Sequence, residues 1–264
     1  MLREVGCRSK SAAPARPPAV DWRSKPRLSE TRYVGEIAAK QMLRDIGVRV
    51  PRGGFAASLD EALRIADSIG YPVALKSASS GVVHKSDVGG VRLDLCDSAE
   101  LCAAWIDMAA ALSARGVRHD EGGLIEEMIA GVGELIVGAR FDPEFGPVVM
   151  FGTGGIFVEL LRDVRIAPVP ISEHEATEML RSLRHWPILD GARGRPKADI
   201  TAAARVAAQL SAFAYARGPE LLEFDINPLI VLPDGGGAVA VDARATVAIA
   251  SLDIPANQRT DLGR

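Results

Sequence analysis

The stretch Tyr71–Leu95, YPVALKSASSGVVHKSDVGGVRLDL, decides how the rest of the chain is interpreted. A short apolar run ends in Lys76, and alternating apolar residues follow the pair Gly89–Gly90. This pattern predicts a strand, a loop and a second strand, with His84 and Lys85 in the loop. Cations and a histidine beside paired glycines suit a polyphosphate, because they combine positive charge with close approach to the backbone. The same residues are equally consistent with a hairpin whose charged tip is solvated.

The composition is that of an ordinary globular protein. With 48% hydrophobic and 25% charged residues, the 264-residue chain has room for one large domain or two modest ones. A formal net charge of -3 gives no reason to expect bulk binding to nucleic acid. No apolar run reaches the roughly 18 to 20 residues of a membrane span. Three unclustered cysteines favour a reducing compartment, so we expect a cytoplasmic protein.

The chain divides into four segments by composition. Residues 1–27 are rich in Pro, Ala, Ser and Arg and are expected to form a disordered leader. Residues 28–121 are predicted to form helices around the hairpin with the His84 loop, whereas residues 122–252 are rich in strands and tight turns. Residues 253–264 form a polar tail. The predicted fold class is therefore α/β (α+β), with two subdomains sharing one cleft.

Periodicity and capping residues place the individual elements. The first helix is predicted from Ser29 to Gly47, and its apolar stripe is Val34, Ile37, Ala38, Met42 and Ile46. Further helices are predicted at 59–69, from 97 or 98 to about 115, at 172–184 and at 200–217. Strands are predicted at 124–129, 133–141, 147–151 and 156–161, and a last pair at 221–232 and 238–244.

The last strand pair allows a geometric inference. If its turn is 233–236, Leu232 pairs with Gly237, and counting back places Asn227 opposite Asp242. Opposed residues hold their Cβ atoms about 5 Å apart on one face. An amide oxygen and a carboxylate at that spacing suit Mg²⁺, with waters and phosphate oxygens completing the octahedron.

The same face of this strand pair carries further acidic residues. Alternation places Asp225 and Glu223 beside Asn227, in a row that is otherwise apolar. A polar, outward face of a hairpin explains them in isolation. An acidic cluster within an apolar row instead favours a bound cation.

The predicted strand at 124–129 would join the two subdomains. Its backbone would be able to hydrogen-bond a purine edge near Met128, and a carboxylate of Glu126 or Glu127 a ribose. The alternative is that these side chains lie on the exposed face of a strand, and Glu134 has the same two interpretations.

Several segments together resemble a known family. In order, YPVALK, HKSDVGGVRLDL, ELIVGARFDPEFGPVVMFGTGGIFVEL, PILDGARGRP, EFDINPL and AVDAR resemble the ATP-grasp domain of ADP-forming acyl-CoA (acetate–CoA) synthetases. The resemblance covers about residues 28–250 and implies an ATP-grasp fold around a nucleotide cleft. The family is related to succinyl-CoA synthetase. It interconverts acyl-CoA, phosphate and ADP with the free acid, CoA and ATP, and it passes phosphate through histidine.

The resemblance also implies roles for individual residues. Asn227 and Asp242 match the family's Mg²⁺ positions, in agreement with the strand count. His84 matches the histidine proposed to receive phosphate from a partner's phosphohistidine before delivery to ADP. The implied cofactors are thus Mg²⁺ and ATP or ADP. Nucleotide contacts are implied for Lys76, Lys85, Glu126, Glu127, Met128 and Glu134.

The sequence also departs from the family. It contains no CoA-binding GxGxxG unit, so we expect an α subunit, carrying its own phosphohistidine, to bind CoA and the acyl substrate. Relatives usually carry an arginine in a segment of the kind FRxAP, which corresponds here to Ala167 with Arg165 nearby. Two rival functions remain: an ATP-grasp carboxylate–amine ligase, and a non-catalytic subunit that senses nucleotides.

Overall fold

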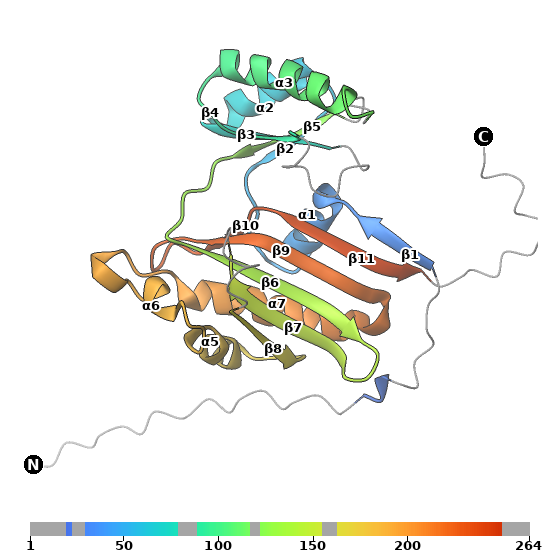
Figure 1. Ribbon diagram of the computed structural model, residues 1–264, viewed down its shortest axis with the longest axis vertical. Helices are drawn as coiled ribbons and strands as arrows, with labels where there is room; N and C mark the ends of the chain where they lie inside the picture. Colours follow the sequence, from blue (N-terminus) through green and yellow to red (C-terminus); the bar gives the residue numbers. More distant parts are fainter. Residues whose placement is uncertain (1–19, 23–29, 79–88, 117–121, 155–162, 250–264) are drawn as a thin grey trace, which may run out of the picture.

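The computed structural model describes residues 20–22, 30–78, 89–116, 122–154 and 163–249. They form two antiparallel sheets, drawn at the top and at the centre of Figure 1. Within these ranges, no helix is long and apolar enough to cross a membrane.

The smaller sheet is built around the predicted hairpin. Its second and third strands along the chain, β3 and β4, pair with Lys76 opposite Val91, and the Ser77 amide donates to the Gly90 carbonyl at 2.8 Å. Two helices cover one face of this sheet (Figure 1). The strand order is β2 (Gly53–Ala56), β5 (Gly123–Glu127), β3 (Val73–Ser77) and β4 (Val91–Leu95), with helices α2 (Leu59–Ile69) and α3 (Ser98–Ser113) above it.

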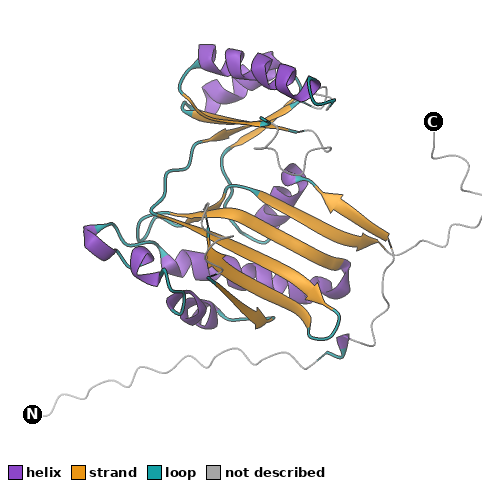
Figure 2. Cartoon of the chain, viewed as in Figure 1, coloured by secondary structure: helices purple, strands orange, loops and turns teal. Residues whose placement is uncertain are grey.

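The larger sheet has seven strands. A long helix crosses one of its faces, as Figure 2 shows. Along the sheet the order is β1 (Glu30–Val34), β11 (Ala243–Ile249), β9 (Leu221–Val231), β6 (Gly133–Asp142), β7 (Gly146–Thr153) and β8 (Val164–Pro168), and β10 (Ala238–Ala240) pairs with β9. Its helices are α1 (Glu36–Asp45), α5 (Glu173–Arg181), α6 (Trp186–Leu189) and α7 (Ile200–Arg217), with short 3₁₀ turns η3 (Ala192–Gly194) and η4 (Gly218–Glu220).

The core of the larger sheet lies under α7. This helix is rich in alanine, so its backbone comes close to the sheet, and Ala203, Ala207 and Leu210 are fully buried against it. From the sheet, Val137 and Phe224 are also fully buried. Such close packing holds the seven strands as one rigid layer.

The prediction for the first helix is partly wrong. Residues 30–34 form a strand rather than a helical turn, because they pair with β11, with Val34 opposite Ala245. The helix begins only at Glu36, and its buried residues are Glu36, Ala39, Lys40 and Leu43. The predicted stripe is partly confirmed, since Val34 is buried and Met42 and Ile46 pack against the core, but Ile37 is 41% exposed.

Other helices agree closely with expectation. Those at 59–69 and 200–217 have the predicted ends, and the N-cap residues Ser58 and Ser172 accept the expected backbone hydrogen bonds from Glu61 and Glu175. The boundary inferred near residue 122 is less simple. Strand β5 begins one residue later but belongs to the smaller sheet, because it pairs with β2 and β3. The chain therefore passes from the smaller to the larger sheet after β5 rather than at residue 122.

Most of the predicted leader and all of the predicted tail lie outside the described residues, as does the predicted strand at 156–161. One residue of the leader is described in contact with the domain. The Trp22 ring lies edge-on to Phe141, at 6.0 Å between ring centroids, and to Tyr215, at 5.8 Å. This contact packs Trp22 against β6 and α7.

A buried carboxylate connects β8 with the turn between α5 and α6. Asp163 accepts hydrogen bonds from the amides of Arg184 and His185, both at 3.1 Å, and lies 2.9 Å from His185 Nδ1. Burial opposes ionisation of this group. The two amides and the imidazole nevertheless lower the pKa of Asp163 below its usual value of 3.8.

Replacing Asp163 by asparagine is expected to lower the free energy of unfolding by about 2 kcal/mol at pH 7, since hydrogen bonds to a charged group are removed. A carboxyl group whose pKa is lower in the folded than in the unfolded protein stabilises the fold at pH values above its unfolded-state pKa. This stabilisation is lost as the pH falls through the folded-state pKa. The difference between Asp163→Asn and the native chain should therefore shrink at pH 3, measured by urea unfolding. Asp190→Asn, at a surface pair, is the control, and an equal destabilisation at both pH values would contradict the assignment.

Candidate functional site

Lys76 lies where the two sheets meet. It is the fourth residue of β3, whose five residues are all buried, and it is 5% exposed. Its ammonium group donates to Glu36 Oε1 and to the Val241 carbonyl, both at 2.7 Å, and lies 3.0 Å from Glu126 Oε2. Of the three donors of an ammonium group, Glu36 and the Val241 carbonyl accept two, and Glu126 is an ion-pair partner of the same group.

A second buried lysine contacts the same two carboxylates. Lys40, on α1, is 1% exposed, and its Nζ lies 2.7 Å from Glu36 Oε1 and 2.5 and 2.7 Å from the two oxygens of Glu126. We call Glu36, Lys40, Lys76 and Glu126 the buried charge cluster. Its two carboxylates and two ammonium groups balance, as buried charges require. Because α1 packs on the larger sheet, the cluster links the two sheets.

The electrostatic environment of the two lysines differs. Burial alone would lower the pKa of Lys76, but the carboxylates of Glu36, Glu126 and Asp242 raise it well above its usual value. For Lys40, burial and the neighbouring charge of Lys76 lower the pKa, and the two carboxylates only partly compensate. Lys76 therefore keeps its proton more firmly than Lys40 does.

Sequence reasoning predicted only half of this cluster. Lys76 and Glu126 were candidates, whereas Glu36 and Lys40 were not. A glutamate and a lysine four residues apart on a helix usually form a solvated surface pair. The one available signal was that spacing, and only tertiary packing shows that this pair is buried.

The predicted pairing of Asn227 with Asp242 is confirmed. The Asn227 amide donates to the Asp242 carbonyl at 3.1 Å, and the neighbouring Val241 amide donates to Pro228 at 3.0 Å. Strand β10 continues the same register, with Ala240 opposite Leu229. Asn227, on the interior strand β9, is exposed, and Asp242, between β10 and β11, is half-buried; the pair lies next to the Lys76 contact at Val241.

The donor set of this pair suits a magnesium ion. It consists of an amide and a carboxylate, and Mg²⁺ prefers oxygen ligands while keeping several waters. In the described part of the chain, no group of three or more His, Cys, Asp or Glu side chains comes together to hold a metal. The residues therefore fit an ion that is shared with phosphate oxygens rather than one enclosed by protein.

The neighbouring acidic residues have other roles. Asp225 lies 3.1 Å from Arg244 Nη2, and the two residues are directly opposite on β9 and β11. Glu223 is exposed. The cation that the sequence led us to expect beside Asp225 is thus the side chain of Arg244.

The segment after β5 passes from the smaller to the larger sheet, as predicted. Glu127 Oε2 lies 2.7 Å from Arg52 Nε, and although burial opposes ionisation, the contacts with Arg52 lower the pKa of Glu127. The Met128 amide donates to the Pro72 carbonyl at 3.3 Å. Glu134 is exposed on β6, and its carbonyl accepts from the Gly154 amide. Glu127, Met128 and Glu134 thus lie along the part of the chain that connects the smaller sheet with the larger one.

His84 and Lys85 lie outside the described residues. The strands on either side of this segment are described, and their pairing extends past Lys76 to the hydrogen bond between the Ser77 amide and the Gly90 carbonyl.

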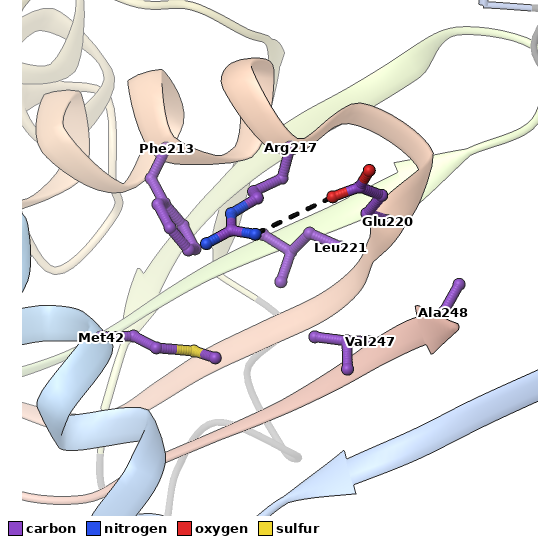
Figure 3. Close-up of a pocket in the computed structure, with 7 residues that line it drawn as sticks. All are labelled: Met42, Phe213, Arg217, Glu220, Leu221, Val247 and Ala248. Carbon is purple, nitrogen blue, oxygen red and sulfur yellow. Dashed lines mark ion pairs between the residues drawn. The ribbon is translucent and has the colours of Figure 1, made fainter. Parts of the chain in front are cut away.

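A small pocket lies at the other end of β11 (Figure 3). Phe213 and Arg217 line it from α7, with the Arg217 guanidinium 5.4 Å from the centre of the Phe213 ring and 3.8 Å from Glu220. Met42 enters from α1. Along a strand, Val247 is about 16 Å from Asp242. None of the predicted site residues lines this pocket.

Comparisons with known proteins agree on one family. A family model described as an ATP-grasp domain matches residues 27–247. The chain is 42% identical over 212 residues to the ADP-forming acetate–CoA ligase II subunit beta of Pyrococcus furiosus, an alignment that covers 79% of this chain and 89% of that subunit. It is 43% identical to the ADP-forming acetate–CoA ligase I of Archaeoglobus fulgidus, covering 75% of this chain but 29% of that protein.

Solved structures give the same result. The Ca. Korarchaeum cryptofilum dinucleotide-forming acetyl-coenzyme A synthetase 1, with coenzyme A, Ca-AMPCP and HgCl+, superposes with a TM-score of 0.77 at 36% identity, covering 82% of this chain and 93% of that one. Another structure of that enzyme holds coenzyme A and Mg-AMPPCP, and its phosphohistidine segment points towards the nucleotide-binding site. It superposes with a TM-score of 0.70 at 35% identity, covering 81% and 92% of the two chains.

Proposed function

Because this chain belongs to the ATP-grasp family, alongside the beta subunits of ADP-forming acetate–CoA ligases, we propose that it is the nucleotide-binding subunit of an ADP-forming acyl-CoA synthetase. The reaction interconverts acid, CoA and ATP with acyl-CoA, ADP and phosphate. The observation that carries the proposal is the position of Lys76, which brings a buried cation beside the Asn227–Asp242 pair. The relatives are named as ADP-forming acetate–CoA ligases, which argues against the ATP-grasp carboxylate–amine ligase that the sequence left open.

The proposed nucleotide site spans both sheets. Asn227 and Asp242 would hold Mg²⁺, which screens phosphate charge when bound. Lys76 and Lys85 supply positive charge to the phosphates. The adenosine pocket is formed by the segment between the sheets, with Glu126, Glu127, Met128 and Glu134.

The partner is an α subunit that binds CoA and the acyl substrate and carries its own phosphohistidine. The relatives named as beta subunits support a second subunit, and the Archaeoglobus fulgidus protein is more than three times as long as the matched part. The complex is assigned to the cytoplasm because the three cysteines of this chain are unclustered, as is usual in a reducing compartment.

His84 is the proposed phosphate carrier on this subunit. In the direction of ATP synthesis, a terminal oxygen of ADP attacks the phosphorus of phosphohistidine, so a P–O bond forms as the P–N bond breaks. The imidazole then leaves as a neutral base once it has taken up a proton. In the opposite direction, the neutral imidazole attacks the terminal phosphorus of ATP and ADP leaves.

Incubating the full chain with terminally labelled ATP and Mg²⁺ should place acid-labile, base-stable label on His84, with the α subunit added in a parallel sample. His84→Asn should abolish the label. His174→Asn should retain it, because His174 is exposed on α5 and far along the chain from the site. Label on the His84→Asn chain, or none on the native chain with its partner present, would refute the carrier assignment.

A further inference from the structure

We propose that Lys40 is a positioning residue that frees Lys76 to bind a nucleotide phosphate, because Lys40 neutralises the carboxylates from which Lys76 must withdraw. The inference rests on the proposed function, since it requires that phosphate binds at Lys76. It assigns Lys40 a part in nucleotide binding although its side chain is buried.

The first step concerns the donors of Lys76. Two of them donate to Glu36 and to the Val241 carbonyl, and Glu126 Oε2 lies 3.0 Å from the same ammonium group. A phosphate oxygen must therefore compete with these oxygens, so Lys76 has to weaken its contact with at least one of them. If Lys76 releases a carboxylate, that carboxylate remains buried, and an unpaired buried charge is strongly unfavourable.

The second step concerns the overlap between the two lysines. Lys40 contacts the same Glu36 oxygen as Lys76, at 2.7 Å, and contacts both oxygens of Glu126. Each carboxylate thus keeps a cationic partner when Lys76 moves. The longest of the Lys76 contacts is that with Glu126, which Lys40 holds most completely.

The third step excludes a direct role for Lys40. It is 1% exposed, and it lies on the face of α1 that also buries Ala39 and Leu43. Its ammonium group is already bound by three carboxylate oxygens. Lys40 therefore acts on a nucleotide only through the freedom that it gives to Lys76.

The test measures ADP binding to the full chain by calorimetric titration, with Mg²⁺ and with a chelator. Lys40→Met removes the cation that contacts both oxygens of Glu126 and shares Glu36 Oε1 with Lys76, so the Kd for ADP should rise about tenfold or more in both conditions. Adding Glu36→Gln restores one cation to one carboxylate, and affinity should return to within about threefold of the native value. Lys40→Arg keeps the charge and should bind more tightly than Lys40→Met.

A second measurement separates positioning from general damage to the fold. With ¹⁵N-labelled lysine, the ammonium signal of Lys76 should shift on ADP addition in the native chain and in Glu36→Gln/Lys40→Met. In Lys40→Met it should stay unchanged at the same ADP concentration. If Lys40→Met does not fold, the double variant decides the question. A double variant that is folded but still binds ADP at least tenfold more weakly would overturn the inference.

Two results would distinguish failure of this inference from failure of the proposed function. Equal ADP affinity of the native chain and folded Lys40→Met would overturn the role of Lys40 and leave the proposed function standing. Failure of the native chain to bind ADP at all would overturn the proposed function and this inference together.

Discussion

Replacing Glu126 by glutamine should lower the free energy of unfolding by about 3 kcal/mol or more, the cost of breaking a buried charge pair by removing one partner. Glu126 is 2% exposed, and the change leaves Lys40 and Lys76 with Glu36 as their one remaining carboxylate in the cluster. Urea unfolding followed by circular dichroism measures the destabilisation. The effect is large because glutamine matches the shape of glutamate but leaves one ammonium charge uncompensated.

The adjacent residue provides a matched control. Glu127 pairs with Arg52, whose side chain is 66% exposed, so Glu127→Gln should cost less than about 1 kcal/mol. Combining Glu126→Gln with Lys40→Met restores one cation to one carboxylate and should recover at least half of the stability. Equal effects at Glu126 and Glu127 would show that the cluster does not carry balanced buried charges.

Asp242→Asn should remove most of the magnesium dependence of nucleotide binding. The change takes the carboxylate from the Asn227–Asp242 pair while leaving the backbone hydrogen bond between the two residues. Affinity for ADP in the presence of Mg²⁺ should fall at least about tenfold, a decrease typical of disturbing groups around a bound metal. Affinity in a chelator should change little, as calorimetric titration would show.

Asp234→Asn is the control for this experiment. Asp234 is exposed in the turn of the same hairpin, so its charge is removed without touching the pair. An undiminished effect of Mg²⁺ in Asp242→Asn would reject Asp242 as a ligand. Tight ADP binding without phosphate transfer would instead favour the nucleotide-sensing subunit that the sequence left open.

Much of the secondary structure could be predicted from local patterns in the sequence. The helix at 200–217 could be predicted to its end residues, because an N-cap aspartate and a following glycine delimit a continuous apolar pattern. The opposition of Asn227 and Asp242 followed from counting across one tight turn. In both cases the deciding interactions join residues that are close in the chain.

The failures came from distant partners. Residues 30–34 look helical by periodicity, but the strand to which they pair begins at residue 243. Lys40 looks like a surface residue until Glu126, 86 residues away, is placed against it. Neither partner is visible in a local window, so tertiary packing overrode the local preference.

Because the buried charge cluster is shielded from solvent, it should respond little to changes in the cell's ionic strength. At physiological salt, mobile ions screen exposed charges beyond about 8 Å, but they do not enter a packed interior. An ionic contact that links two layers of a protein would normally loosen as salt rises. Here the carboxylates and ammonium groups are sealed between α1 and the smaller sheet, so the angle between the layers should be insensitive to osmotic stress and to potassium accumulation.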